Sequence, residues 1–215
     1  MDCTTDFPGC RGEHELQHLE GAQDRAARFY QQQVLDHLND TMQEFVSRQE
    51  MLFIATADRH GECDSSFRAG PPGFIQVLDD KAVAYPEYRG NGVMASMGNL
   101  RENGHIGLLL IDFFRDVIGL HINGRARVVA DEDLRRAYPL PPVDLHPGRR
   151  THLWVLVDVV EAYIHCSKHI PLLAKLPKEQ YWGTDDFKRK GGDFFGARST
   201  PSPWSADEAS AVPSR

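Results

Sequence analysis

The stretch MLFIATADRHGECDSSFR (residues 51–68) decides the class of fold. Residues 51–57 are apolar or β-branched, as in a buried strand, and residues 58–61 are typical of a turn. In the arm that follows, Glu62, Asp64, Ser66 and Arg68 share one face by the two-residue period of a strand. Two strands joined by a short turn make an antiparallel hairpin, so this stretch predicts a β protein built from hairpins.

The same pattern continues along the chain. Residues 74–78 and 81–86 flank an Asp-Asp turn and predict a second hairpin, and further strands are expected at 105–111 and 117–129. The run 153–164 is almost continuous in Val and Leu, as in a strand covered on both faces. Antiparallel strands without a parallel βαβ array predict a closed or partly closed barrel.

Helical patterns lie around these strands. One or two amphipathic helices are expected between residues 14 and 48, a short helix at 93–103 with Val93 on its core side, and another at 131–137. From Gly183 the chain is rich in Gly, Ser and Pro. The sequence therefore predicts a mainly β protein with peripheral helices, divided into three parts: a helical extension over 1–48, a barrel domain over 49–182 and a loose tail over 183–215.

Composition narrows the function classes. A formal net charge of -7 argues against a nucleic-acid binder, because phosphate backbones need clustered Lys and Arg. No stretch approaches the ~20 apolar residues of a membrane-spanning helix, so we expect no membrane partner and a cytoplasmic location. The cysteines lack Cys-x-x-Cys spacing, and we expect reduced thiols and no metal site, either at Cys3, Cys10 and His14 or at His165, Cys166 and His169.

Two segments together offer the chemistry of an anion site. Ser66 and Arg68 lie on the polar face of one strand, and the segment 88–99 carries Arg89, Gly90, Asn91, Ser96 and Asn99 at the start of a helix. Arginine forks, hydroxyls, amides and exposed backbone N–H groups suit a phosphate. The alternative is that both arginines pair with carboxylates and that the glycines serve a tight turn. The usual Gly-x-Gly-x-x-Gly and Gly-Lys-Ser/Thr nucleotide motifs are absent.

A family resemblance supports the first reading. The segments that carry it are FIATA (53–57), GPPGF (70–74), YP (85–86), YRGNG (88–92), SMGN (96–99) and NGRA (123–126). In this order and spacing they resemble the pyridoxamine 5'-phosphate oxidase-like FMN-binding split-barrel family, over about residues 51–168. The resemblance implies a six-stranded antiparallel split β-barrel that forms a homodimer, with flavin mononucleotide (FMN) between the subunits.

The resemblance also implies roles for individual residues. Ser66 and Arg68 would line the phosphate groove, Arg89, Asn91, Ser96 and Asn99 would close around the same cofactor, Pro86 and Tyr88 would flank the ring, and Lys168 would reach a cofactor across the dimer. After Lys168 the chain departs from the family pattern Arg-Ser-x-Leu-Trp, so no stacking role passes to Trp182.

The expected function is that of an FMN-dependent oxidoreductase acting on a small organic substrate. No catalytic acid or base stands out, and His121 and His165 are candidates only because imidazole titrates near neutral pH. Alternatives are a non-catalytic flavin-binding redox sensor or reservoir, and a relative of the same barrel that binds a deazaflavin or haem. The Arg-x-His substrate motif of true pyridoxamine phosphate oxidases is not evident, so vitamin B6 salvage is a minority reading.

Overall fold

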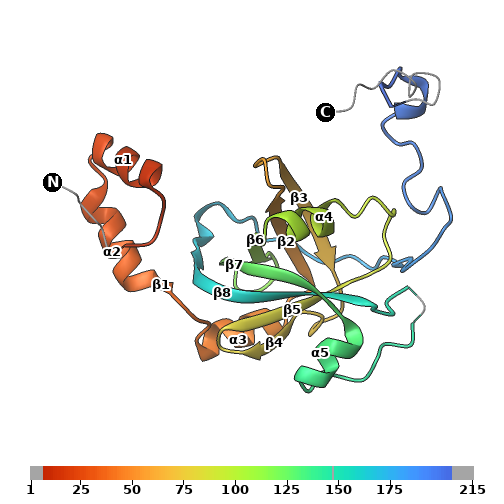
Figure 1. Cartoon of the computed structure of the whole chain (residues 1–215), viewed down its shortest axis with the longest axis horizontal. Coiled ribbons are helices and arrows are strands. Elements are labelled where there is room, and N and C mark those ends of the chain that lie inside the picture. The colour runs from red at the N-terminus through yellow and green to blue at the C-terminus, as the bar shows by residue number, and fades with distance from the viewer. Residues whose placement is uncertain (1–6, 147, 205–215) are drawn as a thin grey trace.

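The computed structural model describes residues 7–146 and 148–204, and a single antiparallel sheet forms its centre (Figure 1). The strands are β1 (Val34–Leu35), β2 (Met51–Ala57), β3 (Cys63–Ala69), β4 (Gln76–Asp79), β5 (Ala82–Glu87), β6 (His105–Asp112), β7 (Ile118–Ala130) and β8 (Leu153–His165). The helices are α1 (Arg11–Leu19), α2 (Gln23–Gln33), α3 (Asp40–Ser47), α4 (Ala95–Glu102) and α5 (Asp131–Ala137), with 3-10 turns η1 (Ser167–His169) and η2 (Ala197–Ser199). The strand order is β3-β2-β6-β7-β8-β5-β4, and β1 pairs with β8.

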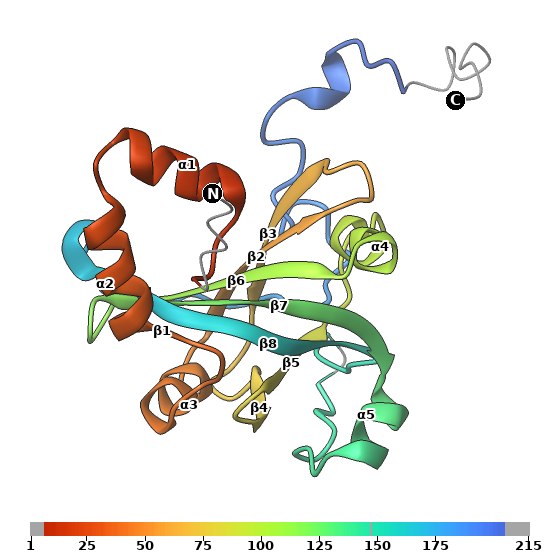
Figure 2. The same ribbon diagram turned by 60° about the vertical axis from the view of Figure 1, so that its left-hand side comes forward.

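The mainly antiparallel β architecture with peripheral helices is confirmed, but the number of six strands is wrong. The sheet has eight strands, because the segment after α2 adds the two-residue strand β1 to β8. The sheet is also not closed, since the end strands β3 and β4 share no pairing within residues 7–146 and 148–204. The protein therefore has a strongly twisted open sheet where the resemblance implied a six-stranded barrel (Figure 2).

The two faces of this sheet differ in what they carry. The face with Ile54, Leu108, Ile122 and Ala162, which follow one another across β2, β6, β7 and β8, is called the inner face below. The face with Phe53, Leu109, His121 and Tyr163, in the neighbouring row, is called the outer face. The inner face carries the main apolar core, which α3 and α4 close with Phe45, Val46, Met97 and Leu100.

A second, smaller apolar cluster lies on the outer face. There α5 packs through Leu134 against Ala82 and Ala84 of β5 and against Trp154 and Leu156 of β8. Because alternate residues of β8 enter the two clusters, the first half of this strand is buried on both faces. The prediction that the 153–164 run is a strand covered on both faces is confirmed for its first half, whereas Asp158 and Val160 are exposed; β8 pairs with β7, β5 and β1.

Several element bounds follow from the sequence and some do not. Residues 51–57 and 131–137 form β2 and α5 as expected. The N-terminal region holds three helices and β1 in place of one or two helices. The helix at 93–103 begins only at Ala95, because Met94 has a left-handed backbone with φ 55°. Val93 therefore precedes the helix and is 72% exposed, so its predicted place in the core is wrong.

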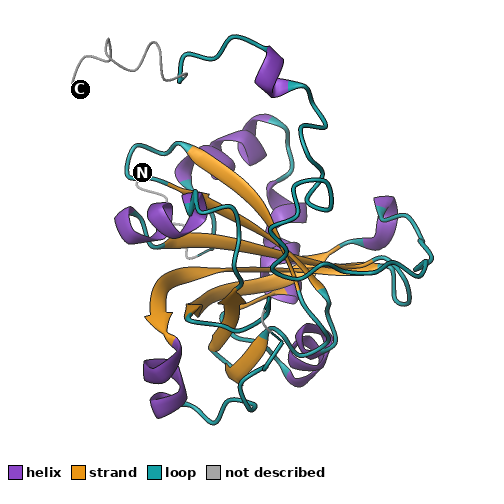
Figure 3. Cartoon of the chain, turned by 90° about the vertical axis from the view of Figure 1, so that its right-hand side faces the viewer, coloured by secondary structure: helices purple, strands orange, loops and turns teal. Residues whose placement is uncertain are grey.

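The two ends of the chain contact the sheet in different ways. Helices α1 and α2 contain no buried residue and stand beside the end of β8 (Figures 1 and 2). After β8 the chain runs back across the molecule, where Leu173 donates its backbone N–H to the carbonyl of Phe113 at 2.8 Å. The chain then reaches Trp182, and beyond it the C-terminal segment leaves the sheet with η2 near its end (Figure 3).

Candidate functional site

The polar row of β3 lies on the inner face, at the edge of the sheet. Asp64, Ser66 and Arg68 are half-buried, while the intervening side chains are exposed. Their partners on β2 are Thr56, Ile54 and Leu52, whose side chains are buried. Side chains directly opposite in an antiparallel pair lie on the same face. The shared face expected of these three polar residues is therefore confirmed.

Helix α4 packs over this polar row. Ser96 donates its hydroxyl to Asp64 Oδ2 at 2.7 Å, and Asn99 donates Nδ2 to Thr56 Oγ1 at 3.1 Å. Ser96 is buried although it is polar, so its hydrogen bond offsets the cost of removing the hydroxyl from water. The strand segment and the helix segment that the sequence analysis singled out are thus in contact.

Arg68 is held by a carboxylate that the sequence analysis missed. Its Nε and Nη2 lie 2.9 and 2.8 Å from Glu87 Oε1, and Nη1 donates to Ser66 Oγ at 2.7 Å. The side chains of Arg68 and Glu87 are only 19% and 15% exposed. Glu87 is the last residue of β5, and its two-residue spacing from Tyr85 was the signal that could have placed it on the inner face.

Next to this ion pair lies a buried hydroxyl without a partner. Tyr85 is fully buried, and its hydroxyl has no hydrogen-bond partner among the described residues. Burial raises the pKa of Tyr85 strongly, the charge of Glu87 raises it further, and the charge of Arg68 lowers it. The unpaired hydroxyl therefore belongs to the same polar cluster, which we call the inner cluster: Asp64, Ser66, Arg68, Tyr85, Glu87 and Ser96.

Arg89 and Asn91 lie in the loop between β5 and α4. Arg89 Nη2 donates to both carboxylate oxygens of Asp185, at 3.0 and 2.8 Å, and both side chains are exposed. Asn91 Oδ1 accepts a hydrogen bond from the backbone N–H of Val93 at 3.0 Å. The two predicted phosphate-binding arginines therefore hold two different carboxylates in this structure, as the alternative reading expected.

Pro86 and Tyr88 lie away from the inner cluster. Pro86 is on the opposite side of β5 from Tyr85 and Glu87, because successive strand residues alternate. With Tyr88 it lines a cavity of about 330 Å³ between β5, α5 and the loop before β8. Burial raises the pKa of Tyr88, and the charge of Asp144 raises it further. The structure thus places the two residues expected to flank the flavin ring in a cavity of their own.

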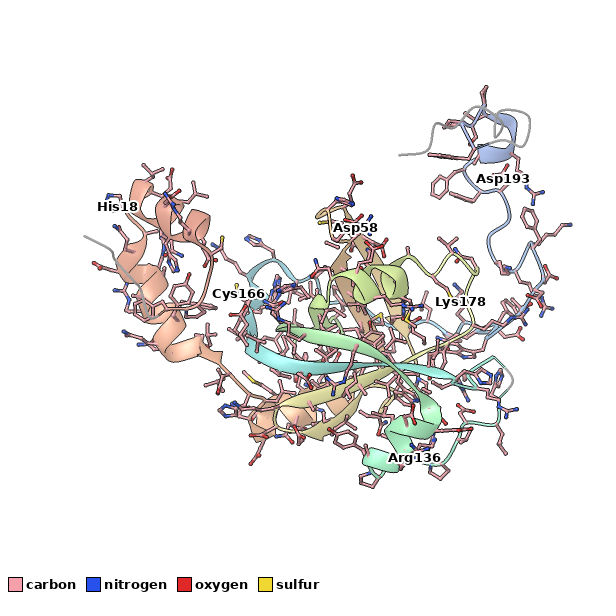
Figure 4. All side chains as sticks on the ribbon, viewed as in Figure 1. His18, Asp58, Arg136, Cys166, Lys178 and Asp193 are labelled. Atoms are coloured by element: carbon pink, nitrogen blue, oxygen red, sulfur yellow. The ribbon has the colours of Figure 1, made fainter. Side chains whose placement is uncertain are left out.

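Lys168 lies at the far end of the molecule. It follows β8, whereas Glu87 pairs with Leu153 at the start of that strand. A strand of 13 residues spans roughly 40 Å at ~3.3 Å per residue. Cys166, two residues before Lys168, and Arg136 of α5 accordingly lie on opposite sides of the molecule (Figure 4). Among the described residues, Lys168 makes no hydrogen bond or ion pair with the inner cluster.

The two candidate histidines lie near that far end. His121 Nε2 and His165 Nδ1 are 2.9 Å apart, and the His121 ring stacks on Tyr163 with centroids 4.7 Å apart. Burial lowers the pKa of His121, and the neighbouring His165 lowers it further. Neither imidazole touches the inner cluster.

The described residues form neither a cluster of metal ligands nor a helix that could span a membrane. Across residues 7–146 and 148–204, no three His, Cys, Asp or Glu side chains converge as metal ligands, and Cys10, Cys63 and Cys166 are free and exposed. Cys3, one of the metal ligands considered above, lies outside the described residues. In the same ranges, no helix has the length and apolar character needed to cross a bilayer.

The inner cluster holds donors of the kind that bind a phosphate, but Arg68 and Ser96 now donate to the carboxylates of Glu87 and Asp64, which a phosphate would have to replace. The donors include a guanidinium, hydroxyls and the unpaired Tyr85 hydroxyl. The adjoining loop has open space at Gly90 and Gly92, where nothing lies within 4 Å of an added Cβ. Backbone N–H groups in such an open loop can approach an anion.

Comparison with known proteins places the chain in a family. Solved structures of similar fold include HupZ from Group A Streptococcus, with 19% identity over 57% of this chain and 89% of that chain and a TM-score of 0.41. HutZ, the heme storage protein from Vibrio cholerae, has 14% identity over 59% and 94% and a TM-score of 0.43. A putative pyridoxamine 5'-phosphate oxidase from Listeria innocua has 13% identity over 58% and 95% and a TM-score of 0.41.

These structural similarities are distant, with TM-scores below 0.5, and say nothing about what this chain binds. No curated protein sequence matches the chain. The family model described as pyridoxamine 5'-phosphate oxidase, however, matches residues 38–166, which is more than half of the sequence. From α3 to the end of β8, the chain therefore belongs to the pyridoxamine 5'-phosphate oxidase family.

Proposed function

We propose that this protein is an FMN-binding flavoprotein and that it acts as an oxidoreductase on a small organic substrate. Family membership supports the flavin, and the donors of the inner cluster support the phosphate end of it. FMN supplies the redox chemistry by accepting or donating two electrons when it is bound. The protein's part is to hold the phosphate, orient the ring and control access of substrate.

One observation carries the proposal. Ser96 at the start of α4 hydrogen-bonds Asp64 of β3, so the helix start lies over the strand face that also bears Ser66 and Arg68. Two polar segments far apart in sequence thereby share one surface. Arg89, Asn91 and Asn99 extend that surface in the proposal, and a phosphate would exchange with the carboxylates that Arg68 and Arg89 now hold.

We further propose that the protein is a homodimer with the cofactor at the subunit interface. Lys168 follows the end of β8 and has no described contact with the inner cluster, so in this proposal it joins the site from a second subunit. The outer face offers a surface for this contact: Phe53 and Phe67 pack together on β2 and β3, and Phe67 is 49% exposed. Apolar side chains on an uncovered sheet face favour association.

The direct test is to purify the protein without added cofactor, record its absorption spectrum and measure the mass of the released ligand by mass spectrometry. The spectrum of an oxidised flavin and the mass of FMN are expected. A deazaflavin or haem would replace FMN in the proposal, and a colourless protein that takes up no FMN would reject it. With FMN bound, turnover with reduced nicotinamides and a panel of acceptors separates an enzyme from a binding module.

The phosphate site is tested by Arg89→Ala. Hydrogen bonds to charged groups contribute roughly 1.5–3 kcal/mol, so FMN affinity is expected to fall about tenfold to a hundredfold in a fluorescence titration. Arg101→Ala is the matched control, because Arg101 is exposed in the last turn of α4. Unchanged FMN affinity in Arg89→Ala would mean that the phosphate binds elsewhere. Elution of the FMN-bound protein at the monomer mass in gel filtration would contradict a site at the subunit interface.

A further inference from the structure

The cavity beside β5 has the features of a second ligand site. It measures about 330 Å³, close to the lower end of the ~300–1,000 Å³ typical of small-molecule pockets. We propose that it binds a small aromatic carboxylate, a flat ring with one negative charge. The proposal goes beyond flavin binding, because the cavity lies on the other side of β5 from Arg68 and Glu87.

The walls suit a flat apolar body. They are formed by Pro71, Pro72, Phe74, Pro86, Pro141 and Trp154. Proline fixes its own φ angle and offers no backbone N–H, so these walls are stiff and present few donors. Aromatic rings in such a setting pack well against another flat ring. A cavity of this size with several flat apolar wall residues therefore favours a single ring over a long flexible chain.

Two arginines in the same lining provide charge. Arg135 donates Nε to Asp131 at 2.8 Å and Nη1 to the Pro141 carbonyl at 2.6 Å, and Arg149 donates Nε to Asp144 at 2.7 Å. Among the described residues, Nη2 of Arg135 and both Nη atoms of Arg149 donate no hydrogen bond. Both side chains are about three-quarters buried, at 26% and 25% exposure. The remaining N–H groups are thus available to a ligand.

The charges of the lining favour a monoanion. Arg135 pairs with Asp131 and Arg149 pairs with Asp144, so two carboxylates already match the two positive charges of the lining. The pKa of Asp144 is lowered by the backbone N–H of His146 and by Arg149, so this carboxylate stays ionised at neutral pH. A carboxylate ligand would add one negative charge beside the two arginines, whereas a phosphate dianion would add up to about two and meet stronger repulsion from Asp131 and Asp144. Arginine forks also match the geometry of a carboxylate.

The C-terminal segment holds one wall of the cavity in place. Trp182 meets the Tyr88 ring edge to face at 5.6 Å between centroids, and the Arg149 guanidinium lies 5.7 Å from the Trp182 ring centre. Gly148 touches the same segment so closely that an added Cβ would lie 2.1 Å from the Trp182 carbonyl carbon. Trp182 is therefore a positioning residue for two lining side chains, and it is not itself part of the lining.

The test is calorimetric titration of the full chain with benzoate, benzamide, acetate and inorganic phosphate. Benzoate is expected to bind at least tenfold more tightly than benzamide, which has the ring without the charge, and more tightly than acetate or phosphate, which lack the ring. Arg135→Gln and Arg149→Gln should each weaken benzoate binding at least tenfold and leave benzamide unchanged. If Arg135→Gln does not fold, as judged by thermal melting, Arg149→Gln carries the test.

The matched control is Arg136→Gln. Arg136 neighbours Arg135 on α5 but is 75% exposed, pairs with Asp133 and does not line the cavity (Figure 4). Benzoate affinity should be unchanged in this variant. Equal binding of benzoate and benzamide, no binding of benzoate, or equal losses in Arg136→Gln and Arg149→Gln would overturn the proposal.

Titration of benzoate in the presence of FMN separates the two proposals. Binding of both ligands together is expected, because they use opposite sides of β5. Competition would mean that the flavin itself fills the cavity and would overturn the inference. Benzoate binding in a protein that takes up no FMN would reject the flavin proposal alone.

Discussion

The two faces of β5 differ in how their arginine side chains are paired. On the inner face, Glu87 pairs with Arg68, and both charges are shielded from water with hydrogen-bonded partners. On the outer face, Pro86 borders a cavity in which Arg135 and Arg149 keep donors unused. On the inner face every group of the Arg68 guanidinium has a partner, whereas on the outer face some guanidinium N–H groups have none among the described residues.

The largest expected difference between the faces concerns ion pairs. Arg68→Ala would leave Glu87 shielded and without its cation, so the free energy of unfolding should fall by about 3 kcal/mol. Arg127→Ala on the outer face removes a pair with Asp158 in which both side chains are 54% exposed, and should cost less than about 1 kcal/mol. Urea denaturation measures both. Equal losses of unfolding free energy in Arg68→Ala and Arg127→Ala would contradict the difference between the two faces.

A smaller effect of opposite sign is expected at Tyr85. Tyr85→Phe removes a buried hydroxyl that has no described partner, and an unsatisfied buried polar group costs about 1–3 kcal/mol. The free energy of unfolding should therefore rise by about 1 kcal/mol. Tyr88→Phe, in the lining of the outer cavity, is the control and should change stability little. A loss of stability in Tyr85→Phe would mean that the hydroxyl has found a partner such as water.

The smallest effect is a pH dependence from the outer face. Burial lowers the pKa of His121 below its ordinary value of 6.5, and His165 lowers it further. The unfolded chain then takes up the proton more readily than the folded one, so stability should fall as the pH drops below about 6.5. In His121→Gln, the melting temperature should depend less on pH below about 6.5. His60→Gln, in the exposed turn after β2, should leave the slope unchanged.

The sequence predicted what depends on neighbouring residues. Alternation placed Asp64, Ser66 and Arg68 on one face, and the apolar run placed β8 at the centre of the sheet. These features follow from local periodicity, because the side chains of a strand alternate and a strand buried on both faces must be apolar throughout.

The partners of the two predicted arginines could not be predicted in this way. Glu87 is 19 residues from Arg68 and Asp185 is 96 residues from Arg89, so neither pair leaves a local pattern. Strand β1 was not predicted for a related reason. It has only two residues, Val34 and Leu35, which is too short for an alternating pattern, and it forms because it pairs with β8. Pairings of this kind are set by the assembled sheet.

The topology of β8 has a consequence for the order in which the chain becomes organised. Within the described part of the chain, the β4–β5 hairpin joins the rest of the sheet only through β8, and no strand follows β8. Until the ribosome has synthesised the residues from Leu153 onward, the hairpin has no further strand to pair with. Its apolar inner residues are then more exposed to solvent than in the folded protein. Contacts between distant segments form slowly and expose such surfaces to aggregation. Chains interrupted before this strand are therefore expected to be clients of chaperones.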